Sequence, residues 1–260
     1  MSQNTPDSPT EVTESFVSHL VELRTRIMWA LGVVLVFFLI LAFGWPGMGA
    51  IYTAVAKPLM AELPKGATMI STDVTGTFMV PMKVTFMAAF VLCLPWVLYQ
   101  IWAFVAPGLY NHEKKLIFPL IVSSTLLFFC GMAFAYYVFF PSVFQLFVKM
   151  TPSGVQMMTD IEKYLSFVMT MFIAFGIVFE TPVVVLTIVR TGLVTVAKLK
   201  EIRPYVFLGA FIVGAIFTPP DVLSQFMLAV PLYVLYEIGI LAAGVMGGKK
   251  AASATESTGA

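Results

Sequence analysis

Six apolar segments alternate with short polar segments along most of the chain. A helix needs about 20 apolar residues to cross the roughly 30 Å hydrocarbon core of a bilayer. The pattern therefore predicts an all-α integral membrane protein, with a six-helix transmembrane domain over residues 18–244, a polar tail over residues 1–17 and a disordered tail over residues 245–260. The predicted spans are Ile27–Phe43, Val80–Val105, Leu116–Phe140, Tyr164–Val189, Tyr205–Phe217 and Asp221–Ala243.

Prolines and a capping pattern refine the second, third and fourth spans. Pro95 is expected to break the second span near its middle, because proline cannot donate a helical hydrogen bond. Pro141 is expected to end the third span. The segment Thr159–Glu162 has the spacing of a capping box, which predicts the start of the fourth helix there.

The last two spans depart from a simple helical bundle. Tyr205–Phe217 would be only about 20 Å long at 1.5 Å per residue. It is joined to the sixth span by the tight turn Thr218–Asp221, which leaves no room for an extramembrane loop. We expect the tip of this hairpin to lie at or below the membrane surface, in a cupped molecule that thins the bilayer or holds a water-filled concavity.

Composition agrees with a protein dissolved in lipid. The chain is 59% hydrophobic and 11% charged, with a mean hydropathy of +0.93 and a formal net charge of +1. Soluble domains are about 45–50% apolar and about 25% charged. The basic residues are spread over several loops and form no stripe, so a nucleic-acid partner is not expected.

The distribution of basic residues predicts the orientation. Cytoplasmic loops of membrane proteins are enriched in lysine and arginine, so the side with ten basic residues is expected to be cytoplasmic, with both termini there. The N-terminus carries Asp7, Glu11 and Glu14 and does not resemble a cleavable signal. The richer side holds Arg24, Arg26, Lys114, Lys115, Arg190, Lys198, Lys200, Arg203, Lys249 and Lys250, and the other side holds Lys57, Lys65, Lys83, Lys149 and Lys163.

Motifs of hydrolases, ATPases and metal sites are absent from the sequence. It contains no HExxH, GxSxG or CxxC motif, and Gly247–Lys250 lacks the glycine spacing and the Ser/Thr of a P-loop. Cys93 and Cys130 are expected to be small residues buried in helices. His19 and His112 are far apart in sequence, so no zinc site is expected. We therefore expect a non-enzymatic protein that needs no cofactor.

Two glutamates on the predicted cytoplasmic side are candidates for ligand binding. Glu22 precedes the first span, and Glu113 lies in the link between the second and third spans, near Phe104. Glu22 has a structural alternative, an i,i+4 salt bridge to Arg26 worth a few tenths of a kcal/mol, and Glu113 could be a solvated loop charge beside Lys114. Their presence on one face favours a receptor for a cationic ligand.

Arginine suits such a pair of carboxylates because its planar guanidinium offers forked donors. Two charge-assisted contacts of about 1.5–3 kcal/mol each fall short of the roughly 8 kcal/mol that micromolar binding requires. The ligand must therefore contribute apolar contacts as well. A peptide with arginines followed by a hydrophobic stretch has both parts.

Three further acidic residues lie in or beside the later spans. Glu180 falls within the fourth span, where a carboxylate costs about 2.5–3.5 kcal/mol. It is either a protonated or paired structural residue, a proton relay, or a docking point for a polar residue of a partner helix. Asp221 is expected to cap the sixth helix, with Gln225 one turn on and on the same face. Glu237 is expected to snorkel towards the cytoplasmic surface.

An extracytoplasmic segment around Pro58 has apolar residues spaced along one helical face. Ile51, Tyr52 and Val55 are among them. The spacing predicts a short amphipathic helix lying on the membrane, which we expect to cap the concavity made by the fifth and sixth spans.

Several motifs together resemble the TatC family, the multispanning core subunits of the twin-arginine protein translocase. The resemblance extends from about Phe16 to Gly244 and includes the family's functional positions. The matching motifs are Ser18–Arg26, Trp102–Glu113, Tyr164–Phe167, Phe179–Pro182, Arg203–Tyr205 and Thr218–Asp221.

The resemblance implies a receptor on the cytoplasmic face of the bacterial inner membrane. Glu22 and Glu113 would bind the paired arginines in the signal peptides of folded cargo proteins, with Arg24 and Phe104 in the same site. Transport would be driven by the proton-motive force, in a multimeric complex surrounded by membrane lipids.

The resemblance also implies an intramembrane contact with partner subunits. Glu180 would engage a polar residue in small single-span subunits of the TatA/TatB type, and Pro58, Asp221 and Gln225 would be further functional positions. The alternative is an ion- or proton-coupled transporter, with Glu180 as the relay and Asp221 lining the path. The sequence disfavours this alternative because few other charges could form a path across the membrane.

Overall fold

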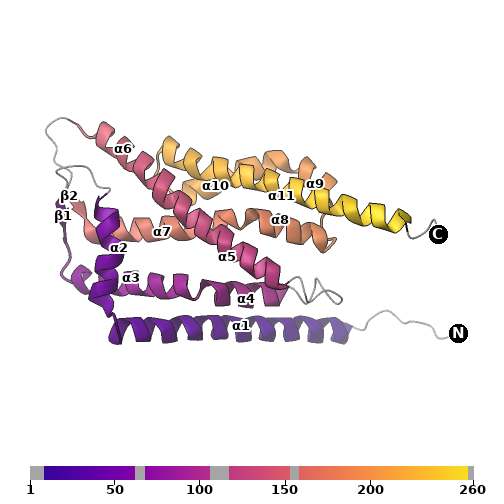
Figure 1. Cartoon of the computed structure of the whole chain (residues 1–260), viewed down its shortest axis with the longest axis horizontal. Coiled ribbons are helices and arrows are strands. Elements are labelled where there is room, and N and C mark those ends of the chain that lie inside the picture. Colours follow the sequence, from indigo (N-terminus) through magenta and orange to yellow (C-terminus); the bar gives the residue numbers. More distant parts are fainter. Residues whose placement is uncertain (1–8, 62–67, 106–116, 153–157, 257–260) are drawn as a thin grey trace.

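The computed structural model describes residues 9–61, 68–105, 117–152 and 158–256. Long helices run along one axis, and α1 (Pro9–Phe43) begins at the same end of the bundle at which α11 (Val222–Glu256) finishes (Figure 1). This is the end predicted to be cytoplasmic, and we call it the cytoplasmic end. At the opposite end, the cap end, lie α2 (Met48–Ala61) and the strands β1 (Thr68–Ile70) and β2 (Met158–Asp160).

The described helices confirm the all-α membrane fold. Four continuous helical segments are long and apolar enough to cross a membrane, and α3 (Gly76–Leu92) with α4 (Leu94–Val105) makes a fifth if the bent pair is one span. A shorter apolar helix, α10 (Arg203–Phe217), corresponds to the predicted fifth span. The count of six spans stays a prediction. The four continuous segments are Val17–Phe43, Phe118–Met150, Ile161–Arg190 and Val222–Val245.

The predicted break at Pro95 is confirmed. α3 and α4 meet at Cys93 with a bend of 60°. Pro95 is the second residue of α4, in the first turn, where a missing N–H leaves no helical bond unmade.

The prediction that Pro141 ends the third span is wrong. α5 (Ile117–Phe134) passes through a π-helical turn, Ala135–Phe139, into α6 (Phe140–Met150). In this wider turn the Phe140 N–H donates to the Ala135 carbonyl, five residues earlier. Pro141 then falls in the first turn of α6, where proline is tolerated.

The fourth predicted span begins close to the predicted position and is interrupted once. α7 (Ile161–Phe179) is capped by Asp160, one residue after Thr159, and is followed by α8 (Thr181–Arg190). The short helix α9 (Val196–Glu201) then leads into α10. Helical backbone also extends into both predicted tails, because α1 starts at Pro9 and α11 ends at Glu256. The predicted domain limits themselves stay predictions.

The aromatic core of the protein lies between the π-helical turn, α6 and α7. Phe139, Phe140 and Phe175 are almost completely buried, and the rings of Phe139 and Phe175 are 4.9 Å apart. By contrast, many apolar side chains of α1, such as Met28 and Trp29, are exposed. Such exposure is expected where the surrounding solvent is lipid.

The short helix predicted near Pro58 is present as α2. α2 packs along α3 and against α1, with Ile51 buried in the aromatic core and Tyr52 and Val55 packed against it. Its apolar face is thus buried against α3 at the cap end, and the expected capping of the fifth and sixth spans stays a prediction. The side chain of Pro58 lies outside the described part of the chain.

Candidate functional site

Glu22 lies on α1 at the cytoplasmic end and makes the predicted i,i+4 salt bridge. Its Oε1 accepts from Arg26 Nε at 2.9 Å and from Arg26 Nη2 at 2.6 Å. The Glu22 side chain is still 37% exposed, and no hydrogen bond from a described residue reaches its Oε2. Half of this carboxylate is therefore available to an incoming donor.

A ring stack joins α1 to α4 next to Glu22. The rings of His19 and Phe104 are stacked, with centroids 4.3 Å apart and an interplanar angle of 19°. Residues three apart lie on the same side of a helix, so His19 and Glu22 are neighbours on α1. Phe104 therefore packs on the face of α1 that also carries Glu22, and its role in a common site stays a prediction.

The other two residues assigned to this site are not joined to Glu22 in the described structure. Arg24 is exposed, and residues two apart on a helix do not face each other. It lines a shallow hollow with Met28 and Trp29. Glu113 lies outside the described residues, in the connection between α4 and α5. The roles of Arg24 and Glu113 stay predictions.

Glu180 occupies the break between α7 and α8 and is buried, with 9% of its surface exposed. Proline at position 182 has no N–H to bond the Val178 carbonyl. The Thr181 hydroxyl donates to that carbonyl instead, at 2.6 Å. The backbone carbonyl that Pro182 cannot bond is thus satisfied by the side chain next to Glu180.

Neither carboxyl oxygen of Glu180 has a hydrogen-bond partner of ordinary geometry among the described residues. The hydroxyl of Ser124, a fully buried residue of α5, lies beside it. A buried polar group without a partner costs free energy. The arrangement can therefore accept a donor brought by another helix.

The next two predicted residues lie in the turn between α10 and α11 and in the first turn of α11. Asp221 caps α11 as predicted, since its Oδ1 accepts from the Ser224 N–H at 2.7 Å. Gln225 Nε2 donates to the Phe211 carbonyl at 2.9 Å, which ties α11 to α10. Asp221 Oδ2 and the Ser224 hydroxyl are buried without a partner among the described residues. Two buried polar atoms at the tip of the hairpin thus lack a hydrogen-bond partner among the described residues.

Glu237 is held by an ion pair rather than by snorkelling alone. Its Oε2 accepts from Arg203 Nη2 at 2.6 Å, across the α10–α11 contact. Snorkelling was inferred from α11 alone, and the tertiary partner from α10 was not foreseen. The neighbouring Tyr236 hydroxyl donates to the Leu199 carbonyl at 2.8 Å and ties α9 to the same end of the molecule.

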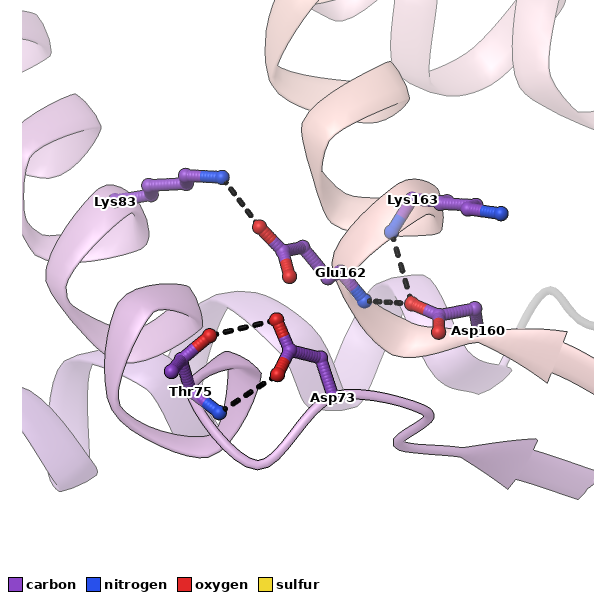
Figure 2. Close-up of polar contacts among 6 residues, drawn as sticks. All are labelled: Asp73, Thr75, Lys83, Asp160, Glu162 and Lys163. Atoms are coloured by element: carbon purple, nitrogen blue, oxygen red, sulfur yellow. Dashed lines mark hydrogen bonds and ion pairs between the residues drawn. The ribbon is translucent and has the colours of Figure 1, made fainter.

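An ionic contact joins α3 to α7 at the cap end. Lys83 Nζ lies 2.6 Å from Glu162 Oε1, and Figure 2 shows the two side chains directed toward each other. Asp160, beside it, accepts from the N–H groups of Glu162 and Lys163 at 2.8 and 3.2 Å. Its position is also set by the parallel pairing of β1 with β2, in which Ile70 is opposite Asp160.

Hydrogen bonds at the cap end favour the ionised form of two aspartates. The Thr72 hydroxyl and then the N–H of Lys163 lower the pKa of Asp160 below its usual value. The hydroxyl and N–H of Thr75 lower the pKa of Asp73 in the same way (Figure 2). These contacts anchor the cap end and lie outside the predicted site.

The described residues contain no group of three or more His, Cys, Asp or Glu side chains that could hold a metal ion. Both cysteines are free, and Cys93 is buried as predicted. Cys130 is exposed on α5, which corrects the expectation that it is buried. Hydropathy identifies an apolar helix but does not say which of its faces meets lipid.

Comparison with known proteins gives one consistent result. Residues 18–231 match the family model for TatC, the Sec-independent protein translocase protein. The chain is 49% identical over 230 residues to the Sec-independent protein translocase protein TatC of Escherichia coli K12, covering 88% of each chain. It is 35% identical to TatCy of Bacillus subtilis, with 87% of each chain covered.

Solved structures agree with these relatives. The crystal structure of a twin-arginine translocase receptor, TatC, superposes with a TM-score of 0.75 at 31% identity, covering 87% of this chain and 98% of the other. A second crystal structure of a TatC receptor, obtained in DDM, gives a TM-score of 0.76 at 32% identity, covering 86% of this chain and 99% of the other.

Proposed function

The chain belongs to the TatC family and is a non-enzymatic subunit of the twin-arginine protein translocase in the bacterial inner membrane, and we propose that it is the subunit that binds the signal peptide. The ligand is the arginine pair of a signal peptide on a folded cargo protein. Membership in a protein-translocase family argues against the alternative function, an ion- or proton-coupled transporter.

One observation carries the proposal: Glu22 presents an open carboxylate oxygen beside the His19–Phe104 stack. Arg26 occupies only Oε1, so a guanidinium can bond Oε2 without first breaking the internal pair. An exposed i,i+4 pair is worth about 0.3–0.5 kcal/mol, against about 1.5–3 kcal/mol for a hydrogen bond to a charged group. The weak internal pair therefore leaves Glu22 able to take an incoming arginine at Oε2.

The hydrophobic stretch of the same peptide has an apolar groove available. A groove of about 730 Å³ runs between α1, α3 and α7, and its lining starts at Ala30. Ala30 is eight residues after Glu22, or about 12 Å along α1. We propose that arginines at Glu22 and an apolar segment in this groove bind together, with Glu113 as the second carboxylate and Arg24 at the edge of the site.

Partner subunits are proposed to bind at Glu180. Single-span subunits of the TatA/TatB type would bring a polar side chain to its unpartnered carboxyl oxygens. Asp221 and Gln225, at the α10–α11 turn, would form a second contact through the open Asp221 Oδ2. Pro58 would act at the cap end. Export would be driven by the proton-motive force.

The test is the affinity of the complete translocase for a fluorescent twin-arginine peptide. Glu22→Gln replaces a charge-assisted bond with a neutral one, a loss of about 1–1.5 kcal/mol, so we expect Kd to rise by about five- to tenfold. Glu113→Gln should weaken binding similarly. Glu201→Gln is the matched control, since Glu201 is an exposed carboxylate paired with Lys198 near the same end of the bundle. An unchanged Kd in the Glu22/Glu113 double variant, at normal abundance, would contradict the proposal.

A further inference from the structure

A buried hydrogen bond links α4 to α5 in the interior of the bundle. Trp102 Nε1 donates to Ser124 Oγ at 2.9 Å. Trp102 is 6% exposed and Ser124 is completely buried. Tryptophan N–H groups usually find a partner when buried, so this bond fixes which side of the serine oxygen accepts.

Ser124 differs from the hydroxyl residues on either side of it. Ser123 donates to the Leu120 carbonyl at 2.9 Å, and Thr125 donates to the Ile121 carbonyl at 2.8 Å. Both are therefore satisfied within α5, as is common for hydroxyls in helices. Among the described residues, Ser124 makes no such bond to its own helix. Its single proton remains available to an acceptor on another helix.

The register of α5 against α7 places Glu180 opposite that proton. The two helices touch closely where a Cβ on Gly131 would lie 2.4 Å from the Phe175 carbonyl oxygen. They touch again where a Cβ on Gly176 would lie 2.4 Å from the ring of Phe128. Because the helices are antiparallel, the next turn of α5 in this direction carries Ser124, and the end of α7 carries Glu180.

Helix α4, whose Trp102 donates to Ser124, also reaches the proposed recognition site. Trp102 and Phe104 are two residues apart on α4, so they face different neighbours. Trp102 packs with Phe128 of α5 and Val183 of α8, one turn from Glu180. Phe104 stacks on His19 of α1. A shift of α4 at the stack therefore moves the donor that holds Ser124.

We propose that Ser124 positions the Glu180 carboxyl by donating a hydrogen bond to it, and that the hydrogen bond from Trp102 orients Ser124 for this role. The inference rests on the proposed function of Glu180 as a partner-binding residue. It deepens that function, because α4 then links a peptide bound beside Phe104 to the availability of Glu180. While Ser124 donates to Glu180, the carboxyl is held within the chain. When α4 shifts, this hydrogen bond is lost and the Glu180 carboxyl can bond a polar residue of the partner helix.

The first test is infrared difference spectroscopy of the purified chain in lipid, with Glu180→Gln as the reference that isolates the Glu180 carboxyl bands. Ser124→Ala and Trp102→Phe should each shift these bands, since the first removes the donor and the second removes the N–H that orients it. Ser124→Thr should retain the wild-type position. Ser123→Ala is the matched control and should leave the bands unmoved. Bands at the wild-type position in Ser124→Ala would overturn the proposal.

The second test measures the link in the complete translocase. A photocrosslinker at Val184, an exposed residue one turn after Glu180, reports contact with single-span subunits with and without a twin-arginine peptide. We expect the peptide to change the yield severalfold in the wild type. In Ser124→Ala the ratio should fall to about one, with an unchanged Kd for the peptide. A wild-type ratio in that variant, or no peptide effect in the wild type, would refute the link.

The two proposals fail in different ways. Loss of the proposed function appears as normal peptide affinity in the Glu22/Glu113 double variant. The infrared measurement contains no peptide and no partner subunit. It therefore tests the Ser124–Glu180 contact independently of what binds at the cytoplasmic end.

Discussion

A methyl group added at Gly131 should force α5 away from α7. A Cβ at this position would lie 2.4 Å from the Phe175 carbonyl oxygen and 3.0 Å from the Gly176 Cα. Both neighbours are backbone atoms, so no side-chain rotation can relieve the clash. The helices must separate by about 1 Å before the contact reaches the usual distance of about 3.5 Å.

The expected cost follows from two opposing effects. Overpacking a close contact typically destabilises a protein by about 1–3 kcal/mol. Replacing glycine by alanine inside a helix returns about 0.5–1 kcal/mol. Because the clash involves backbone, we expect Gly131→Ala to destabilise the chain by about 1–2 kcal/mol. At about 2–4 °C per kcal/mol this lowers Tm by about 2–8 °C.

Thermal unfolding in detergent, with three glycine variants, measures this effect. Gly176→Ala should lose less stability than Gly131→Ala, because its new Cβ meets the side chain of Phe128 and not backbone atoms. Gly32→Ala on α1 has no atom within 4 Å of the new Cβ and should be as stable as the wild type or slightly more stable. If Gly131→Ala unfolded at the same temperature as Gly32→Ala, the close approach of α5 to α7 would be wrong.

Three further predictions concern charged residues. Arg26→Met leaves both oxygens of Glu22 free and should tighten binding of a twin-arginine peptide by about twofold, from the 0.3–0.5 kcal/mol of the pair it removes. Weaker binding in a titration would mean that Arg26 assists the ligand. Hydrogen bonds hold the folded pKa of Asp160 below 3.8, so its contribution to stability is full above pH 3.8 and is lost as pH falls through the folded pKa. Asp160→Asn should therefore make Tm decrease less steeply as pH falls. An unchanged slope would mean that other groups cause the loss of stability in acid. Glu237→Gln removes the half-buried ion pair with Arg203 and should lower stability by about 1 kcal/mol, measured by unfolding in detergent, whereas a stability equal to wild type would show that the pair contributes nothing.

Hydropathy located the long apolar helices, because in lipid each spanning segment must satisfy its own backbone hydrogen bonds. The prolines were harder to interpret. The effect of Pro95 was predicted correctly, since it breaks the second span. Pro141 was misjudged, because a π-helical turn before it removes the need for its N–H. Phe139 in that turn and Phe140 after it pack against α7, which is a long-range contact.

The charged residues of the candidate site were visible in the sequence because charge is rare in this chain. Glu22 and Glu180 stood out beside or inside apolar segments, and the spacing of Glu22 and Arg26 predicted their salt bridge. The stack of His19 on Phe104 was not foreseen, since the two histidines were weighed only as metal ligands. The position of His19, three residues before Glu22 and so on the same side of α1, was the signal that could have indicated this stack.

The sequence by itself determined the membrane-helical class, the family and the acidic residues worth testing, because these depend on local composition and on short motifs. Only the tertiary structure decided which side chains meet: Trp102 with Ser124, Lys83 with Glu162, and Arg203 with Glu237. These partners are 22, 79 and 34 residues apart. Helical periodicity reaches only three or four residues along the chain, so contacts between helices depend on their register and crossing, which no local pattern encodes.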